Sequence, residues 1–251
     1  MRYLGNKSKI ADEILEVILK DAKPDQYYVE PFVGSAAVIQ RVPNTFRRIG
    51  ADKNPYLIAL LIAVRDGWEP PSTVTEEEYN EIKRNMSAYP KELVGFVGFA
   101  CAFGGAFFTT FARHNKGSAG KEQPYARNGH DALMRDAPLY RGIEFRCTSY
   151  ASLEVPEDAI VYCDPPYEKT SGYAYSVNNF TEFWNWCGHL IDTGRKVFVS
   201  GYSQPVGWDV VWEKKMICMV TNQDLDKKDD LGRKVSLKRD RTEKLFTRQP
   251  K

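Results

Sequence analysis

The chain has 251 residues, of which 43% are hydrophobic and 27% are charged. This composition is that of a globular protein and excludes a disordered chain, and the length suits one large domain or one domain with an insertion. The net charge of only +2 excludes a polycation, so any polyanionic partner must be met by a local basic patch.

The first predicted elements alternate between helices and strands. Residues 8–20 carry apolar side chains at helical spacing and predict an amphipathic helix that Ser8 caps. Residues 27–42 predict a short strand, a Pro/Gly turn and a helix, and a second strand ends near Asp52 before a helix from Pro55. This alternation is typical of a parallel sheet covered by helices.

Regularity lapses from residue 67 to about residue 145. This region holds a polar helix at 76–86, an uncharged stretch at 93–112 and a polar loop at 113–131. The uncharged stretch is long enough to span a bilayer. Its aromatic residues recur every three or four positions, which predicts instead a helix buried within protein. A membrane crossing would also separate motifs on its two sides, so we expect no membrane segment.

Strand-like segments resume after this region. Strands are predicted around 143–150, 159–163 and 196–202, with a helix at 181–191. Two further strands, in 210–220 and 242–248, flank a charged turn. The outline is one α/β domain split by an insertion of about 80 residues.

The cysteines and histidines indicate no metal or disulfide chemistry. Five cysteines show no C-x-x-C spacing, and Cys147, Cys163 and Cys218 lie in strand-like runs, which predicts reduced, buried thiols in a cytosolic protein. The three histidines are not spaced with cysteines or acids as metal ligands, so we expect no metal site.

Two predicted strand ends carry candidate binding residues, at the edge where parallel sheets bind ligands. Gly34, in the turn after Glu30, would let the backbone approach a ligand, although an ordinary turn also explains it. Asp52 could accept hydrogen bonds from ribose hydroxyls or cap the following helix. Neither a P-loop nor a G-x-G-x-x-G fingerprint is present, which favours a nucleoside-type ligand without phosphates.

A third strand end reads D-P-P-Y from Asp164. The two prolines fix the backbone, leave the Pro165 carbonyl as an acceptor near the carboxylate, and hold Tyr167 nearby. Two acceptors and an aromatic face match a planar base with an exocyclic amino group. The alternative is a turn that happens to contain this tetrapeptide.

Four stretches resemble, in order, the motifs of the Dam-like family of DNA adenine-N6 methyltransferases. They are RYLGNK at 2–7, VEPFVGSAAV at 29–38, GADKNPYLI at 50–58 and the segment 147–167 that ends in DPPY. The resemblance covers most of the chain apart from the insertion. It implies S-adenosylmethionine as cofactor, duplex DNA as partner, and a cytoplasmic monomer that is bacterial or phage-encoded.

The resemblance also implies a fold and a division of the chain. The fold would be α/β, with a Rossmann-like, mostly parallel sheet, helices on both faces and an inserted, mainly helical target-recognition domain. Residues 1–66 and 146–251 would bind the cofactor and catalyse transfer, and residues 67–145 would bind DNA.

The resemblance assigns roles to individual residues. The cofactor-binding residues would be Tyr3, Lys7, Glu30, Phe32, Gly34, Asp52, Tyr150 and Asp164. The catalytic residues would be Asp164, Pro165 and Tyr167. Apart from the resemblance, the cations Arg113, Lys116, Lys121 and Arg127 of the insertion, and those of the turn at 227–241, could contact DNA phosphates, although an ordinary solvated surface explains each of them equally well.

Two departures from the family pattern are visible. Tyr3 replaces the usual tryptophan and keeps an aromatic wall. Ala36 replaces the second motif glycine, which predicts helical backbone at that residue because alanine disfavours positive φ.

Other acceptors share the exocyclic amino group: cytosine N4, an RNA adenine or a protein glutamine amide. The first residue of the motif is Asp164 and not Ser or Asn, which favours adenine over the other acceptors. A catalytically inactive DNA-binding relative is a further alternative, and the intact set of Lys7, Asp52 and the DPPY motif disfavours it.

Overall fold

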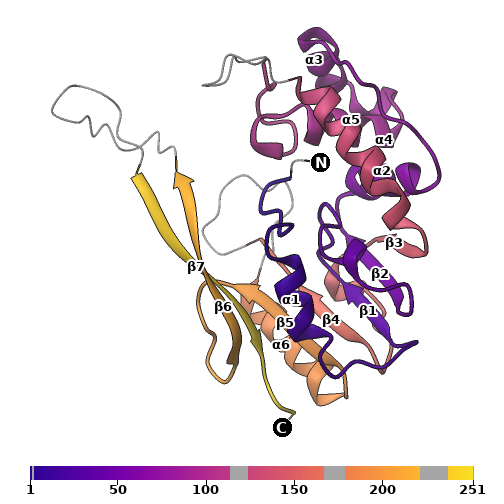
Figure 1. Ribbon diagram of the computed structural model, residues 1–251. Coiled ribbons are helices and arrows are strands. Elements are labelled where there is room, and N and C mark those ends of the chain that lie inside the picture. The colour runs from indigo at the N-terminus through magenta and orange to yellow at the C-terminus, as the bar shows by residue number, and fades with distance from the viewer. Residues whose placement is uncertain (2, 114–123, 167–178, 221–236, 251) are drawn as a thin grey trace, which may run out of the picture.

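The computed structural model describes residues 1, 3–113, 124–166, 179–220 and 237–250. In this part of the chain, one seven-stranded sheet has the order β3-β2-β1-β4-β5-β7-β6 (Figure 1). The strands are β1 Tyr27–Glu30, β2 Arg47–Asp52, β3 Ile143–Cys147, β4 Ile160–Cys163, β5 Lys196–Gly201, β6 Asp209–Val220 and β7 Leu237–Thr247. The first five strands in this order (β3, β2, β1, β4 and β5) pair in parallel, and β7 is antiparallel to both β5 and β6. The predicted Rossmann-like, mostly parallel sheet is therefore confirmed.

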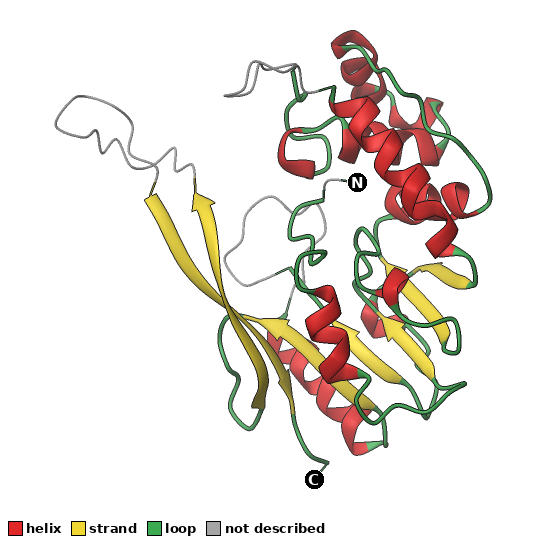
Figure 2. Cartoon of the chain, in the orientation of Figure 1, coloured by secondary structure: helices red, strands yellow, loops and turns green. Residues whose placement is uncertain are grey.

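Helices cover both faces of the sheet (Figure 2). Helices α1 (Ala11–Ile18) and α2 (Pro55–Arg65) share a hydrophobic core with Tyr28 of β1, whereas α6 (Phe180–Asp192) packs in a second core with Val29. Successive side chains of a strand point to opposite faces, so this short central strand contributes to both cores.

Side-chain caps mark the starts of three of the six α-helices that the structure describes. Asn54 caps α2 by accepting hydrogen bonds from the backbone N–H groups of Tyr56 and Leu57, and Thr75 forms a capping box with Glu78 at α3 (Glu76–Arg84). The expected Ser8 cap of α1 is wrong. The N-cap is Ile10, because the Ser8 N–H donates to Asn6 Oδ1 at 2.7 Å in a turn before the helix.

The region inserted between α2 and β3 contains α3, α4 (Lys91–Ala100) and α5 (Tyr125–Asp136). Val94 and Phe96 of α4 belong to the same core as Leu57 and Leu60 of α2. The two helices approach closely at Gly95, where an added Cβ would lie 2.2 Å from the Tyr56 carbonyl oxygen. The inserted helices thus extend the core of one sheet face. The boundaries at residues 67 and 145 stay predictions.

Short 3-10 turns complete the described elements. They are η1 Ile39–Arg41, η2 Met86–Ala88, η3 Phe103–Gly105, η4 Ala137–Tyr140 and η5 Tyr150–Ser152.

Two expectations for the insertion are wrong. The helix expected over 93–112 ends at Ala100, where the chain folds back through left-handed Gly104 and Gly105 and lays the Phe107 ring against Gly98. The loop expected over 113–131 contains the start of α5, whose Gly129 fits against α4 at Ala100. Among the described residues, no helix is long and apolar enough to cross a membrane.

Expectations near the β1 turn and at one cysteine are also wrong. No α-helix follows Gly34; the chain makes only the short η1 turn. The backbone φ is +49° at Gly34 and +59° at Ala36, and two left-handed residues so close together prevent a helix. The Cys147 thiol is exposed where β3 ends, whereas Cys163 is buried as expected. The Cys218 side chain lies outside the described residues.

We expect Gly95→Ala to lower the free energy of unfolding by roughly 1–3 kcal/mol, because the new methyl group collides with backbone and forces α4 away from α2. Urea unfolding would measure the change. Gly188→Ala in α6 is the comparison, since its Cβ would lie 3.0 Å from a side-chain atom, Arg248 Nη2, and not against backbone, and higher helix propensity offsets part of the contact. Equal effects of the two substitutions would contradict the close contact.

Candidate active site

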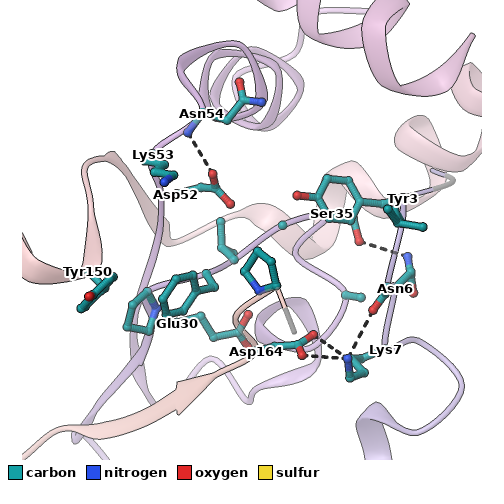
Figure 3. A pocket seen from close by; sticks show the side chains of 18 of the residues that line it. Tyr3, Asn6, Lys7, Glu30, Ser35, Asp52, Lys53, Asn54, Tyr150 and Asp164 are labelled. Atoms are coloured by element: carbon teal, nitrogen blue, oxygen red, sulfur yellow. Dashed lines mark hydrogen bonds and ion pairs between the residues drawn. The ribbon is translucent and has the colours of Figure 1, made fainter. Parts of the chain in front are cut away.

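A cleft of about 280 Å³ opens at the carboxyl ends of β1, β2 and β4 (Figure 3). Its walls include segments far apart in sequence, among them the N-terminal residues 3–7, the turn after β1, the fold-back loop of the insertion and residues 148–151. Acids end or follow each of the three strands: Glu30, Asp52 and Asp164. The predicted meeting of strand-end acids at one edge is observed.

One wall of the cleft forms where the Tyr3 ring packs on the backbone of Gly34. An added Cβ at Gly34 would lie 2.9 Å from Cε1 of the Tyr3 ring, so the absence of a side chain lets the ring pack on the backbone. The Tyr3 ring also contacts Phe99 of α4, with ring centroids 5.3 Å apart. Asn6 donates to the Ser35 hydroxyl at 3.0 Å and fixes the same segment over the turn.

Asp52 lies at the end of β2 within a ring of backbone donors. Its Oδ1 accepts the Asn54 N–H at 2.9 Å, and the N–H groups of Gly34 and Lys53 also donate to the carboxylate. Burial outweighs these contacts and raises the pKa of Asp52 to about 6. The group is therefore mostly ionised at neutral pH and can accept hydroxyl protons of a ligand.

Glu30 ends β1 and is buried. The Tyr28 hydroxyl donates to its Oε1 at 3.0 Å, and the Ile39 N–H also donates to the carboxyl group. Burial raises the pKa of Glu30 well above its usual range, and the charge of Asp164 raises it further. This environment favours the neutral acid, which can donate as well as accept a hydrogen bond.

Lys7 holds the Asp164 carboxylate. Its Nζ lies 2.7 Å from Oδ1 and 2.8 Å from Oδ2 of Asp164, and 3.7 Å from Oε1 of Glu243. Burial lowers the pKa of Lys7, but the two acids outweigh burial, so the pKa lies above its ordinary value. Lys7 is thus a fixed cation that keeps Asp164 at the cleft.

Aromatic rings line two other sides of the cleft. Phe32 and Tyr150 pack together with ring centroids 5.5 Å apart, and Phe183 of α6 supports both from behind. On the insertion side, Phe107 reaches the cavity from the fold-back loop. Apolar ring faces beside buried acids suit a ligand that combines a flat heterocycle with polar and cationic groups.

The cleft brings together all eight predicted cofactor-binding residues, namely Tyr3, Lys7, Glu30, Phe32, Gly34, Asp52, Tyr150 and Asp164. Pro165 is buried next to Asp164. Tyr167, Lys116 and Lys121 lie outside the described residues.

The two remaining predicted DNA-binding residues lie away from the cavity. The Arg113 guanidinium pairs with both carboxylate oxygens of Glu76, at 2.9 and 2.8 Å. Arg127 is exposed on α5. Their roles in DNA binding stay predictions.

Several residues that line the cleft were missed from the sequence: Asn6, Ser35, Asn54, Phe107, Asn179 and Glu182. Asn54 and Asn179 are helix caps, and the position of Asn54 just after the predicted strand that ends near Asp52 was a detectable signal. Phe107 had no such signal, because it depends on the fold-back of the insertion. Among the described residues, no group of three His, Cys, Asp or Glu side chains could hold a metal ion.

Comparisons with known proteins agree with the motif analysis. Residues 3–93 match the family described as D12 class N6 adenine-specific DNA methyltransferase. The chain is 28% identical over 210 residues to the DNA adenine methylases of Escherichia coli K12 and O157:H7, covering 72% of this chain and 70% of each relative. The matched segment 3–93 includes the wall formed by Tyr3 and Gly34 and the acids that end β1 and β2.

Solved structures show more distant likeness. The putative methyltransferase yhhF from Escherichia coli aligns with a TM-score of 0.38 and 11% identity, over 99% of this chain and 90% of its own. SMU.472, a putative methyltransferase complexed with SAH, aligns with a TM-score of 0.40 and 11% identity, over 98% and 53%.

We expect the affinity for S-adenosylmethionine, the cofactor that the resemblance implies, to be full above pH 6 and to fall below it. Hydroxyl donors stabilise the ionised form of Asp52, so binding below its pKa of about 6 requires proton loss. Isothermal titration calorimetry should show a weakening of up to about tenfold per pH unit. Asp52→Asn should bind more weakly and flatten this profile, whereas Asp66→Asn, an exposed acid elsewhere, should not. Identical profiles for all three proteins would refute the role of Asp52.

Proposed function

We propose that the chain is an N6 adenine-specific DNA methyltransferase of the D12 class, and that its cleft transfers a methyl group from S-adenosylmethionine to N6 of an adenine flipped out of duplex DNA. The observation that carries this proposal is that Asp52 and Asp164 line the same cavity. One acid suits the ribose of a methyl donor and the other suits the amino group of an acceptor.

The donor set of the cleft fits S-adenosylmethionine. Asp52 would accept hydrogen bonds from the ribose hydroxyls, and Phe32, Tyr150 and Tyr3 offer aromatic faces to the adenine and the apolar chain. The ionised acids at the strand ends, Asp52 and Asp164, suit a ligand that carries both a sulfonium and an ammonium charge. When bound, this cofactor supplies an electrophilic methyl group.

Asp164 would activate the acceptor nitrogen. The N6 lone pair of adenine is delocalised into the ring, and a hydrogen bond from N6–H to the Asp164 carboxylate, with a second to the Pro165 carbonyl, favours a more tetrahedral nitrogen. Transfer would form the N6–CH₃ bond as the S–CH₃ bond breaks, with the electron pair left on sulfur, and N6 would then release one proton to solvent. The carboxylate stabilises the positive charge that develops on N6.

The acceptor base must leave the duplex, because N6 inside the helix is out of reach of a cleft at a sheet edge. Flipping costs a few kcal/mol. We propose that Tyr167, which lies outside the described residues, stacks on the flipped base and offsets part of this cost by about 1–3 kcal/mol.

The insertion, residues 67–145, is proposed to bind the surrounding DNA. Its packing against the wall of the cleft at Tyr3 and Phe99 supports this assignment, since DNA held there would lie next to the cavity. Exposed cations of this region, such as Arg127, would contact phosphates. We further propose that the protein acts as a monomer in the cytoplasm.

We expect Asp164→Asn to lower the single-turnover rate of methyl transfer to duplex DNA at least about 100-fold, because the neutral amide stabilises the developing charge less. The assay uses cofactor with a labelled methyl group, followed by nucleoside digestion and chromatography. Asp158→Asn, an exposed acid six residues earlier, is the matched control and should keep the wild-type rate. Retained transfer in Asp164→Asn would exclude its assigned role.

The same digestion identifies the acceptor. N6-methyladenine in the DNA supports the proposed function. N4-methylcytosine, or label that appears only with RNA or protein, would overturn it.

We expect Arg127→Ala to weaken DNA binding about equally across sequences and to reduce the slope of log K against log salt by about 1. Fluorescence anisotropy at several salt concentrations would measure this. Arg47→Ala is the control, because this exposed arginine begins β2 at the end of the strand opposite to Asp52. An unchanged slope for Arg127→Ala would remove α5 from the DNA-binding surface.

A further inference from the structure

The last strand of the sheet carries a buried acid, Glu243. It lies opposite Lys214 of β6, and the residue is only 5% exposed. Leu245, two residues later and therefore on the same face of β7, belongs to the core beneath α1. A carboxylate on this apolar face costs free energy unless a charged partner compensates it, so its presence calls for an explanation.

Lys7 supplies that compensation. The Lys7 ammonium lies 3.7 Å from Glu243 Oε1 and 2.7 Å from Asp164 Oδ1. One cation thus stands between two carboxylates that come from β4 and β7. The Lys7 and Glu243 side chains are 9% and 7% exposed, so solvent screens this interaction little.

The charges of this cluster have a direct consequence for the proposed transfer. The charges of Lys7 and Asp164 alone sum to zero. This pair by itself would therefore place a group of zero net charge beside the target nitrogen. Glu243 adds a second negative charge, so the three groups together carry −1. A net negative site stabilises a nitrogen that becomes cationic better than a neutral pair does.

We propose that Glu243 is a positioning residue for methyl transfer, which holds Lys7 against Asp164 and keeps the Lys7–Asp164–Glu243 cluster net negative. This inference rests on the proposed function. Glu243 acts through Lys7 and does not line the cleft.

Other ionisable groups surround the cluster. The Tyr202 hydroxyl interacts electrostatically with both Glu243 and Lys7. The Arg241 guanidinium lies over the Tyr202 ring, 5.4 Å from the ring centroid. The Tyr162 hydroxyl bonds to Ser200, and burial raises its pKa. The two tyrosines are neutral at neutral pH, and Glu30 next to Asp164 is favoured as the neutral acid, so these three groups leave the charge of the three-residue cluster unchanged. Arg241 is a cation that interacts with Tyr202 outside the cluster.

The first test measures transfer in Glu243→Gln, which keeps the shape of the side chain and removes its charge. We expect the single-turnover rate to fall about 10- to 100-fold, while the dissociation constants for S-adenosylmethionine and DNA change less than about twofold. Glu243→Asp should recover part of the rate. Glu213→Gln is the matched control, since this exposed acid pairs with Lys244 on the same hairpin at 3.6 Å.

A double variant tests whether Glu243 acts through Lys7. In a Lys7→Met background, Glu243→Gln should cause no further loss of rate, because residues that act as a unit are not additive. Independent, multiplicative losses would overturn the positioning role. So would a wild-type rate in Glu243→Gln.

A second readout needs no catalysis. Acetic anhydride reacts only with the neutral amine, and mass spectrometry gives the acetylation rate of Lys7 in the folded protein. Glu243→Gln should speed this reaction about 3- to 10-fold, because the cation loses one stabilising partner, and Glu213→Gln should not. An unchanged rate would overturn the inference even if the wild type transferred no methyl group. If the wild-type protein does not methylate adenine, that result by itself overturns only the proposed function.

Discussion

The ion pair between Lys7 and Asp164 joins two of the segments that form the cleft. It ties the loop before α1 to the end of β4, two segments separated by 157 residues. Because both groups are largely buried, removing either one leaves a charge without its partner, at a cost of about 3–5 kcal/mol in comparable pairs. The contact therefore fixes the N-terminal segment, and with it Tyr3, over the edge of the sheet.

That position of Tyr3 connects the two parts of the molecule. Its ring packs on the Gly34 backbone of the sheet and on Phe99 of the insertion, and the Leu4 N–H donates to the Gly105 carbonyl at 3.3 Å. The insertion and the sheet thus share one wall of the cleft and one continuous core. This packing places the face of the insertion that carries Phe99 next to the cavity.

The sequence was sufficient to predict the acids of the cleft. Asp52 and Asp164 follow apolar strand-like runs, and parallel strands bring their carboxyl ends together, so spacing along the chain translated into proximity. The same reasoning could not find Phe107 or Glu243. Phe107 reaches the cavity only because two glycines turn the chain back after α4, and Glu243 stands in a strand whose charged residues look solvent-exposed. Contacts between segments far apart in sequence have no local signal.

Ala36 shows why one motif glycine can be replaced and the other cannot. A left-handed backbone costs a residue with a Cβ roughly 1–2 kcal/mol. The Ala36 methyl group is fully buried, and burial of one carbon returns about 0.8 kcal/mol, so much of the strain is offset. At Gly34 the same conformation coincides with the Tyr3 ring, 2.9 Å from any added Cβ. A side chain there would add a collision to the strain and displace the aromatic wall, so only the second position tolerates alanine.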